Sequence, residues 1–286
     1  MPGDFPIESR FTLEERIGRG VSGDVHRGRD RATGAFVAIT RVTPAGAPLP
    51  IDRFRRDARL FALINDPNVV RYVAHGVDSM GRLCLVVEWL EGEDVAQRTR
   101  RRRLTVAEAL DVGRQAARGL AALHRVGIVH GDVRPANLFL VGSGARIHVK
   151  VLDPGVARPA QAATPEPALA PYYASPEQAR REERLTPRAD QFALASVVFE
   201  LLSGRRAFPG DDAKAVLAKI ALAEPPRLRD VVPGAPPELC ALLARAMSKP
   251  QDCRFGSMVE MADALGAVGP WAPLEEPTID EEPGEG

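Results

Sequence analysis

Cysteine is scarce in this sequence of 286 residues, and its cysteines are far apart. Cys84, Cys240 and Cys253 form no Cys-x-x-Cys pair. A zinc site built on such pairs is therefore excluded, and a disulfide framework is not indicated. Reduced, mostly buried thiols are typical of cytosolic proteins, so we expect a cytoplasmic location.

The sequence also lacks a net charge and a long apolar run. Thirty-eight Lys and Arg balance thirty-eight Asp and Glu, so no global field favours nucleic acid or an anionic membrane. The longest apolar stretch, residues 192–202, contains Glu200 and is too short to span a bilayer. The first ten residues contain acids and prolines but no apolar core, unlike a signal peptide. We expect a soluble protein with no nucleic-acid partner and no membrane segment.

The residue patterns divide the chain into two unlike parts, which predicts an α+β fold with a cleft near residues 88–95. Alternating apolar residues predict strands near 11–18, 23–30, 35–42, 69–77 and 82–90, with a hairpin turn at 31–34 and one helix over 51–64. Helical periodicity predicts helices at 106–127, 189–203, 211–223, 236–248 and 257–267. The acidic, proline-rich residues 269–286 are expected to be disordered.

The stretch GRGVSGDV contains Gly18, Gly20 and Gly23 in the spacing G-x-G-x-x-G. Dinucleotide-binding folds use the same spacing, but there the loop precedes a helix and an acidic residue follows about 20 positions later. Here a second strand follows, and the corresponding region has no acid. A glycine loop between two strands can fold over a triphosphate with its backbone N–H groups. A plain glycine-rich hairpin is the alternative.

Two further stretches contain the polar residues of a phosphoryl-transfer site. In IVHGDVRPANLFL, Asp132 and Asn137 lie five residues apart, after a helix and before an apolar strand. In VKVLDPG, Asp153 follows another short strand. A carboxylate can accept a proton from an attacking hydroxyl, and carboxylate and carboxamide oxygens can hold Mg²⁺.

Together these three motifs resemble those of protein kinases of the bacterial Ser/Thr type. The resemblance covers about residues 11–268. It implies a bilobal fold, with an antiparallel β N-lobe with one main helix over 11–88, a hinge at 88–92 and a helical C-lobe over 93–268, after an N-terminal extension at 1–10. It also implies that the protein binds ATP with Mg²⁺, or Mn²⁺ as an alternative, and phosphorylates a protein substrate or signalling partner.

The resemblance assigns a role to each candidate residue. Asp132 would orient the hydroxyl beside Arg134 and Asn137, and Asn137 and Asp153 would hold the metal. The nucleotide would meet Gly18, Gly20, Gly23, Val25, Ala38, Thr40, Phe139 and the backbone of Glu88 and Leu90, with Val87 as the gatekeeper. Structural roles would belong to Asp57, to His130, to Asp190 as a brace of the catalytic loop, and to an ion pair between Glu177 and Arg254.

The sequence departs from the family at the lysine that normally contacts the α- and β-phosphates, where it has Thr40. Asp57, one methylene shorter, replaces the glutamate that normally pairs with this lysine, so we expect the pair to be lost. Losing one preorganised charge typically costs about 3 kcal/mol of transition-state stabilisation. We therefore expect a slow enzyme rather than an inert one. Arg27, on the same strand face as Val25, is a candidate replacement, although a solvated arginine is the plainer interpretation.

Other departures fall around the activation segment. Pro154 replaces a phenylalanine that would stack on Phe61, Tyr72 and His130. Ala170 replaces a threonine, Arg134 a lysine, and Gly131 an arginine that reads a phosphorylated loop. We therefore predict that phosphorylation of Thr164 does not activate the protein by that route.

Three functions remain open at this stage. The first is a slow Ser/Thr kinase, the second a catalytically inactive pseudokinase acting as a signalling scaffold, and the third a small-molecule phosphotransferase of the aminoglycoside kinase kind. Among other features, the arginine run at residues 98–103 is expected to be a solvated loop between two helices. His124 and His130 suit core roles better than zinc, and Thr278 is a candidate phosphosite.

Overall fold

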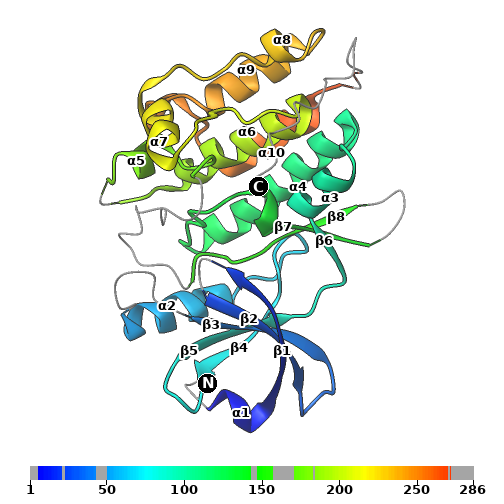
Figure 1. Ribbon diagram of the computed structural model, residues 1–286, viewed down its shortest axis with the longest axis vertical. Coiled ribbons are helices and arrows are strands. Elements are labelled where there is room, and N and C mark those ends of the chain that lie inside the picture. The colour runs from blue at the N-terminus through cyan, green and yellow to red at the C-terminus, as the bar shows by residue number, and fades with distance from the viewer. Residues whose placement is uncertain are drawn as a thin grey trace.

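The computed structural model describes residues 6–20, 23–42, 50–142, 147–156, 171–182, 184–269 and 271. Figure 1 shows two lobes stacked along the long axis of the molecule, with the N-terminal strands in one and most of the helices in the other. The predicted bilobal α+β fold, with a β-rich N-lobe and a helical C-lobe, is therefore confirmed.

The N-lobe is built on a five-stranded antiparallel sheet in the order β1-β2-β3-β5-β4. Its strands are β1 (Phe11–Gly20), β2 (Gly23–Asp30), β3 (Phe36–Val42), β4 (Tyr72–Val77) and β5 (Leu83–Glu88). The turn predicted at 31–34 joins β2 to β3. Asp30 accepts a hydrogen bond from the Ala32 backbone, and Gly34 has a positive φ of 73°, a conformation that glycine adopts without strain.

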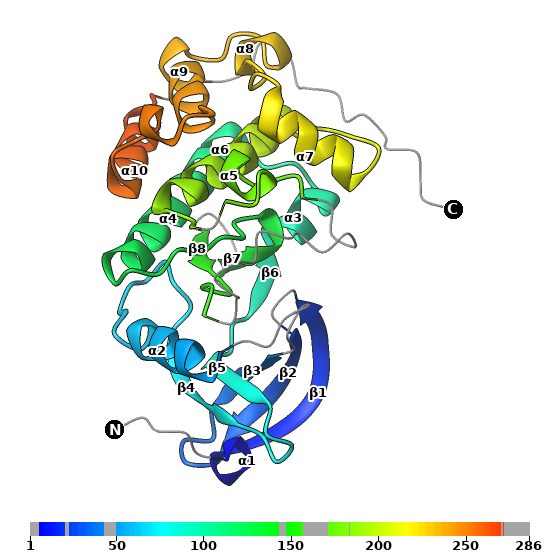
Figure 2. The same ribbon diagram turned by 90° about the vertical axis from the view of Figure 1, so that its left-hand side faces the viewer.

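The two faces of this sheet are covered differently. One face buries a small cluster that includes Phe11, Val37 and Ile39, and the short helix α1 (Ile7–Arg10) adds Ile7 to it. Arg10 also pairs with Asp30 at 2.6 Å. Residues 6–10 of the predicted extension thus pack on the sheet. The main helix α2 (Ile51–Phe61) contributes to the larger core that continues into the C-lobe and lies beside the sheet in Figures 1 and 2.

The C-lobe combines a small sheet with helices. Strands β6 (Gly92–Asp94), β7 (Leu138–Val141) and β8 (His148–Val151) form an antiparallel sheet in that order. The helices are α3 (Val95–Arg101), α4 (Val106–Arg125), α5 (Pro176–Ala179), α6 (Pro187–Ser203), α7 (Ala213–Leu222), α8 (Leu228–Val231), α9 (Pro237–Ala246) and α10 (Met258–Ala267), with 3-10 turns at Pro135–Asn137 and Gln251–Cys253. Helix α6 is buried along nearly its whole length. No helix in the described ranges is both long and apolar enough to cross a membrane.

One local prediction is wrong. The arginine run was expected to form a loop, but Arg98, Arg100 and Arg101 lie in the last turns of α3. A capping box between Asp94 and Gln97 starts this helix, and such reciprocal capping stabilises a first turn. Arg98 and Arg101 both pair with Glu93 in β6, at 2.5 and 2.8 Å.

The connection between α2 and β4 docks the N-lobe on the C-lobe. The Asn68 side chain donates to the Val149 carbonyl at 2.9 Å and to Gln115 at 3.1 Å. The Val151 backbone donates to the Asn68 carbonyl at 2.8 Å, and Val70 donates back to Val151 at 3.0 Å. Because Asn68 and Gln115 are buried, these bonds fix how residues 68–70 lie on β8.

The predicted ion pair between Glu177 and Arg254 is present in the C-lobe. The Arg254 guanidinium donates to both carboxylate oxygens at 2.8 and 2.9 Å, and the two side chains are only 0% and 2% exposed. Arg254 also donates to the backbone carbonyls of Ser248, Arg188 and Lys249. Its donors are thus used within the lobe, which joins the start of α5 to the segment before α10.

Glu177→Gln should lower the free energy of unfolding by about 3–5 kcal/mol, because Arg254 would keep its charge without a buried counter-ion. Asp252→Asn is the matched control. Asp252 pairs with Arg188 at 2.7 Å, but its side chain is 94% exposed, so its loss should cost about 1 kcal/mol or less. Urea denaturation measures both values. Equal losses in the two variants would contradict a special contribution of the buried pair.

Candidate active site

The loop between α4 and β7 is held in place by one buried carboxylate. Asp190, in α6, accepts hydrogen bonds from the backbone N–H groups of His130 at 2.9 Å and Gly131 at 2.8 Å. Its Oδ2 also lies 2.7 Å from Nε2 of His124. Gly131 has φ 71°, which glycine tolerates readily. Asp190 thus contacts the backbone just before Asp132, in the bracing position that the sequence predicted.

The pKa of Asp190 reflects two opposing effects. Burial raises it, but the hydrogen bond and charge of His124, the charge of His130 and the Gly131 N–H lower it. The net pKa lies below the ordinary value of an aspartate. The ionised form is therefore the one that the folded state favours.

Asp132 and Asn137 are joined by a tight turn. The Asn137 amide nitrogen donates to the Asp132 carbonyl at 2.8 Å and to its carboxylate at 2.9 Å. Nε of Arg134 lies 3.4 Å from the same carboxylate. Because the amide nitrogen faces Asp132, the carbonyl oxygen of Asn137 is the atom that a metal would use. The three predicted catalytic residues are therefore next to one another.

Backbone hydrogen bonds bring the Asp153 segment to this loop. The Leu152 N–H donates to the Asn137 carbonyl at 2.9 Å, and His130 Nε2 lies 2.7 Å from the Leu152 carbonyl. Asp153 itself has φ 48°, an uncommon conformation for a residue other than glycine. Such strain is found at functional sites more often than elsewhere. The two predicted metal ligands, Asn137 and Asp153, thus belong to segments that are bonded to each other.

The donor set of this site fits Mg²⁺ in the presence of a phosphate ligand. Asn137 and Asp153 supply an amide oxygen and a carboxylate, the hard donors that Mg²⁺ prefers. Among the described residues, no group of three His, Cys, Asp or Glu is placed to hold a metal. Mg²⁺ typically binds to one or two protein ligands and completes its shell with water and phosphate oxygens.

The phenylalanine stack of the family is present only in part. Phe61 and Tyr72 meet edge to face with ring centroids 5.8 Å apart, and Tyr72 Oη lies 2.7 Å from Nδ1 of His75. Pro154 is buried but has no aromatic ring to add. At the next residue, Gly155, a Cβ would come within 2.7 Å of the Val129 carbonyl oxygen, so this segment packs tightly without the stack.

The predicted nucleotide-binding residues lie on adjacent strands of the N-lobe sheet, at residues 88–90 and in the small sheet. Gly18 and Gly20 pair with Val25 and Gly23 across the β1–β2 hairpin, whose tip, residues 21–22, lies outside the described residues. Val25 pairs with Thr40, and Ala38 pairs with Val87. In the other lobe, Gly92 has φ 148°, and a Cβ there would lie 3.0 Å from the Phe139 ring. The half-buried Val25, Ala38, Leu90 and Phe139 are thus carried by elements that meet at the hinge.

The Asp57 carboxylate pairs with two arginines, since the usual lysine is absent. Its carboxylate accepts two hydrogen bonds of 3.0 Å from Arg56 and one of 3.4 Å from Arg53, all within α2. Asp57 is buried, so these arginines supply the counter-charge that a buried carboxylate needs. Thr40 cannot form the usual ion pair, but the Asp57 carboxylate is not left unpaired.

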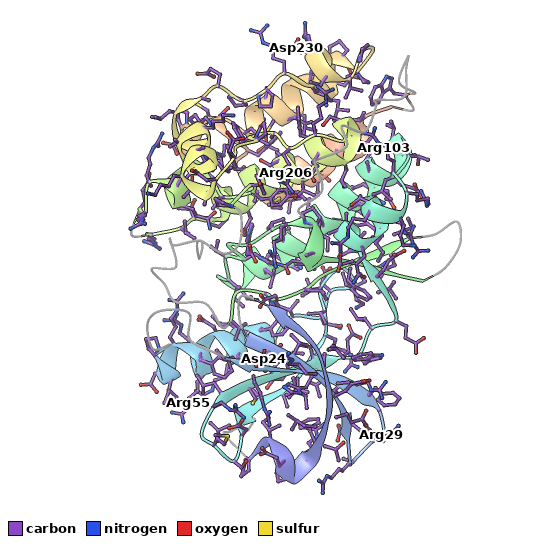
Figure 3. The ribbon with its side chains drawn as sticks, in the orientation of Figure 1. Asp24, Arg29, Arg55, Arg103, Arg206 and Asp230 are labelled. Atoms are coloured by element: carbon purple, nitrogen blue, oxygen red, sulfur yellow. The ribbon has the colours of Figure 1, made fainter. Side chains whose placement is uncertain are left out.

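Arg27 is engaged elsewhere. It pairs with Glu14 at 2.7 Å and with Glu15 at 3.5 Å, and its guanidinium lies 5.0 Å from the centroid of the Phe36 ring. The Arg29 guanidinium lies 4.3 Å from the centroid of the same ring, and Figure 3 shows Arg29 at the outer edge of the sheet, away from the C-lobe. The structure therefore does not support Arg27 as the replacement for the lysine.

Sequence reasoning missed two contacts around the site. Lys150, in β8, pairs with Glu88 at 2.8 Å, and the Gln178 side chain donates to the Gly131 carbonyl at 2.8 Å. Lys150 interrupts the apolar strand HVKV, which was the available signal for a special role. Ala170 and Thr164 lie outside the described residues, as do Thr278 and most of the acidic tail.

The comparison with known families decides the family of this two-lobed arrangement. A model of the protein kinase domain matches residues 11–259. This chain belongs to the protein kinase family. The bracing Asp190, the Asp132–Asn137 turn and the Asp153 segment are therefore the parts of a kinase C-lobe.

Several curated relatives of this chain are bacterial. Serine/threonine-protein kinase pkn2 of Myxococcus xanthus is 32% identical over 284 residues, covering 93% of this chain and 33% of that protein. PknA of Mycobacterium tuberculosis is 33% identical over 273 residues, covering 92% and 62%. PknL of the same species is 32% identical over 269 residues, covering 92% and 66%. The resemblance to bacterial Ser/Thr kinases is confirmed, while the chain spans only one to two thirds of these relatives.

The Asp190 brace gives a pH prediction. Because its pKa is lower in the folded state than in the unfolded chain, its stabilisation is complete above the unfolded pKa of about 3.9 and is lost as the pH falls through the folded value. The difference in unfolding free energy between wild type and Asp190→Asn should thus not narrow from pH 7 to pH 5. Urea denaturation at a series of pH values measures it. Narrowing within that range would mean that burial raises the Asp190 pKa instead.

Proposed function

We propose that this protein is a Ser/Thr protein kinase that binds Mg-ATP and transfers phosphate to a protein substrate slowly. The observation that best supports this proposal is the turn in which Asn137 donates to the Asp132 carboxylate at 2.9 Å. It orients the proposed proton acceptor and leaves an amide oxygen for the metal.

Each residue has a defined task in the proposed reaction. Asp132 orients the substrate hydroxyl and accepts its proton as the oxygen attacks the terminal phosphorus, while the bond from that phosphorus to the bridging oxygen breaks and ADP leaves. Asn137 and Asp153 would hold Mg²⁺, which neutralises charge on the phosphate oxygens when it is bound. Arg134, 3.4 Å from the Asp132 carboxylate, keeps a positive charge beside the transferred phosphate. The hydroxyl of Thr40 can hydrogen-bond a phosphate but cannot neutralise it.

A pseudokinase is the second candidate, and the charges of the N-lobe favour it. The chain has four lysines, Lys150, Lys214, Lys219 and Lys249, and therefore none before residue 150. Asp57 is satisfied by Arg53 and Arg56, so α2 can hold its position without a phosphate-binding cation. A signalling scaffold needs a stable α2 but no cation that binds phosphate. The small-molecule phosphotransferase has no observation of this kind in its favour.

Nucleotide binding and phosphate transfer are tested in sequence. Mg-ATP should raise the Tm of the wild type by stabilising the native state. Radiolabelled phosphate transfer to a generic basic protein should then be measurable and should fall at least about a hundredfold in Asp132→Asn. Binding without any transfer would establish the pseudokinase. An Asp132→Asn variant as active as wild type would refute the proposed mechanism.

Restoring the lysine at position 40 should raise kcat fully only if Asp57 can form an ion pair with it. In Thr40→Lys alone, Arg53 and Arg56 compete for the carboxylate, so we expect less than about a tenfold gain in kcat. Adding Asp57→Glu and Arg56→Ala lengthens the acid and removes its closest partner, which should bring the gain to about a hundredfold. Steady-state kinetics of the three proteins measures this. A full gain from Thr40→Lys alone would show that the α2 arginines do not hold Asp57.

A further inference from the structure

Lys150 forms an ion pair that crosses between the lobes at the hinge. Its ammonium lies 2.8 Å from Oε1 of Glu88, with the two side chains only 15% and 17% exposed. It also donates to the Val69 carbonyl at 3.3 Å. Lys150 lies in β8, three residues before Asp153, whereas Glu88 ends β5. The pair thus joins the strand that leads to the metal-binding segment to the first residue of the hinge.

The position of Lys150 in the small sheet places it beside the proposed adenine site. Phe139 in β7 is directly opposite Lys150 in the antiparallel register. Residues directly opposite each other in such a pair extend to the same face of the sheet. Val149 and Val151, on the other face, are buried in the core. Lys150 therefore extends from the floor of the proposed nucleotide site to the hinge.

Glu88 is held from two sides at the other end of the pair. Its Oε1 also accepts a hydrogen bond from the Arg71 backbone at 2.8 Å. Its own backbone N–H donates to the Arg71 carbonyl at 3.0 Å. The backbone of Glu88, which is expected to meet the adenine edge, is therefore fixed by its side chain as well as by its main chain.

The strand that carries Lys150 is equally fixed beyond it. Leu152 bonds through its N–H to the Asn137 carbonyl and through its carbonyl to His130. A continuous series of short contacts thus runs from Glu88 through Lys150 and Leu152 to the two proposed metal ligands. Each of these contacts is shorter than 3.0 Å.

We propose that Lys150 and Glu88 are a positioning pair that sets the distance between the hinge and the metal ligands. This inference rests on the proposed nucleotide-binding function. ATP with Mg²⁺ must reach both places at once, so its affinity depends on their separation, much as that of a two-module ligand does. Adenosine has no phosphates to reach the metal ligands, so its affinity does not depend on that distance. The pair is largely desolvated, so removing Glu88 leaves the Lys150 charge poorly compensated. Among the described residues, removing Lys150 leaves Glu88 only Nε of Arg71, at 3.7 Å on a side chain that is 65% exposed.

Lys150→Met and Glu88→Gln should each raise the Kd for Mg-ATP about tenfold, and the double variant should be no weaker than either single one. The Kd for adenosine should change less than about twofold, and Lys150→Arg should bind Mg-ATP as wild type does. Calorimetry measures these constants. Unchanged Mg-ATP affinity, additive losses, or equal losses for adenosine and Mg-ATP would each overturn the proposal.

Lys249→Met is the matched control at pH 7. Lys249 is half-buried, donates to the Ile220 carbonyl at 2.6 Å and lies 4.3 Å from the Phe208 ring, within the C-lobe and away from the hinge. Its loss should lower Tm without changing the Kd for Mg-ATP. A Kd change as large as that of Lys150→Met would assign the effect to general destabilisation and overturn the proposal.

Amide hydrogen exchange without nucleotide separates this inference from the proposed function. Lys150→Met should raise exchange in residues 88–92 and 152–156 together, since the pair links both segments. If the wild type binds no nucleotide but this joint change occurs, the nucleotide-binding function fails and the positioning pair stands. An increase in one segment only, or in neither, would refute the pair whatever the nucleotide result.

Discussion

The site depends first on the carboxylate of Asp190, which α6 holds at the centre of the C-lobe. A buried carboxylate is costly unless its oxygens are bonded, and here two backbone N–H groups and one imidazole bond to them. Those N–H groups belong to His130 and Gly131, so the cost of burying one charge is offset only when the loop before Asp132 adopts this conformation. Core packing of α6 therefore fixes the geometry of the catalytic loop.

Charge in the N-lobe is arranged around the absence of lysine. In a typical kinase, one ammonium serves both the phosphates and the acid of the main helix. Here Asp57 is neutralised by Arg53 and Arg56 from its own helix, and Arg41 pairs with Asp78 at the other end of the sheet. Each of these three arginines thus forms an ion pair with an aspartate of the N-lobe. Asp57 is thus compensated before any nucleotide binds, which removes one means of coupling nucleotide binding to the position of α2.

Much of the fold followed from local patterns. Alternation predicted all five N-lobe strands, and helical periodicity predicted α2, α4, α6, α7, α9 and α10 to within a few residues. Prediction failed where the decisive contact joins two different elements and leaves no mark on the periodic pattern of either. The end of α3 depends on arginines pairing with Glu93 in β6, and the burial of Ile7 depends on the far face of the sheet. Motifs predicted Asp132, Asn137 and Asp153, but the partners of Asp57, Arg27 and Lys150 required the spatial arrangement.

The polar contacts that join the two lobes therefore differ from those of a kinase that has the usual lysine. With Thr40 unable to form an ion pair, the short polar links between the lobes run along the back of the hinge, through residues 68–71, Glu88 and β8. These contacts involve half-buried charges and backbone groups, which salt screens less than it screens exposed pairs. A kinase built this way would hold its lobes in a nearly constant relation.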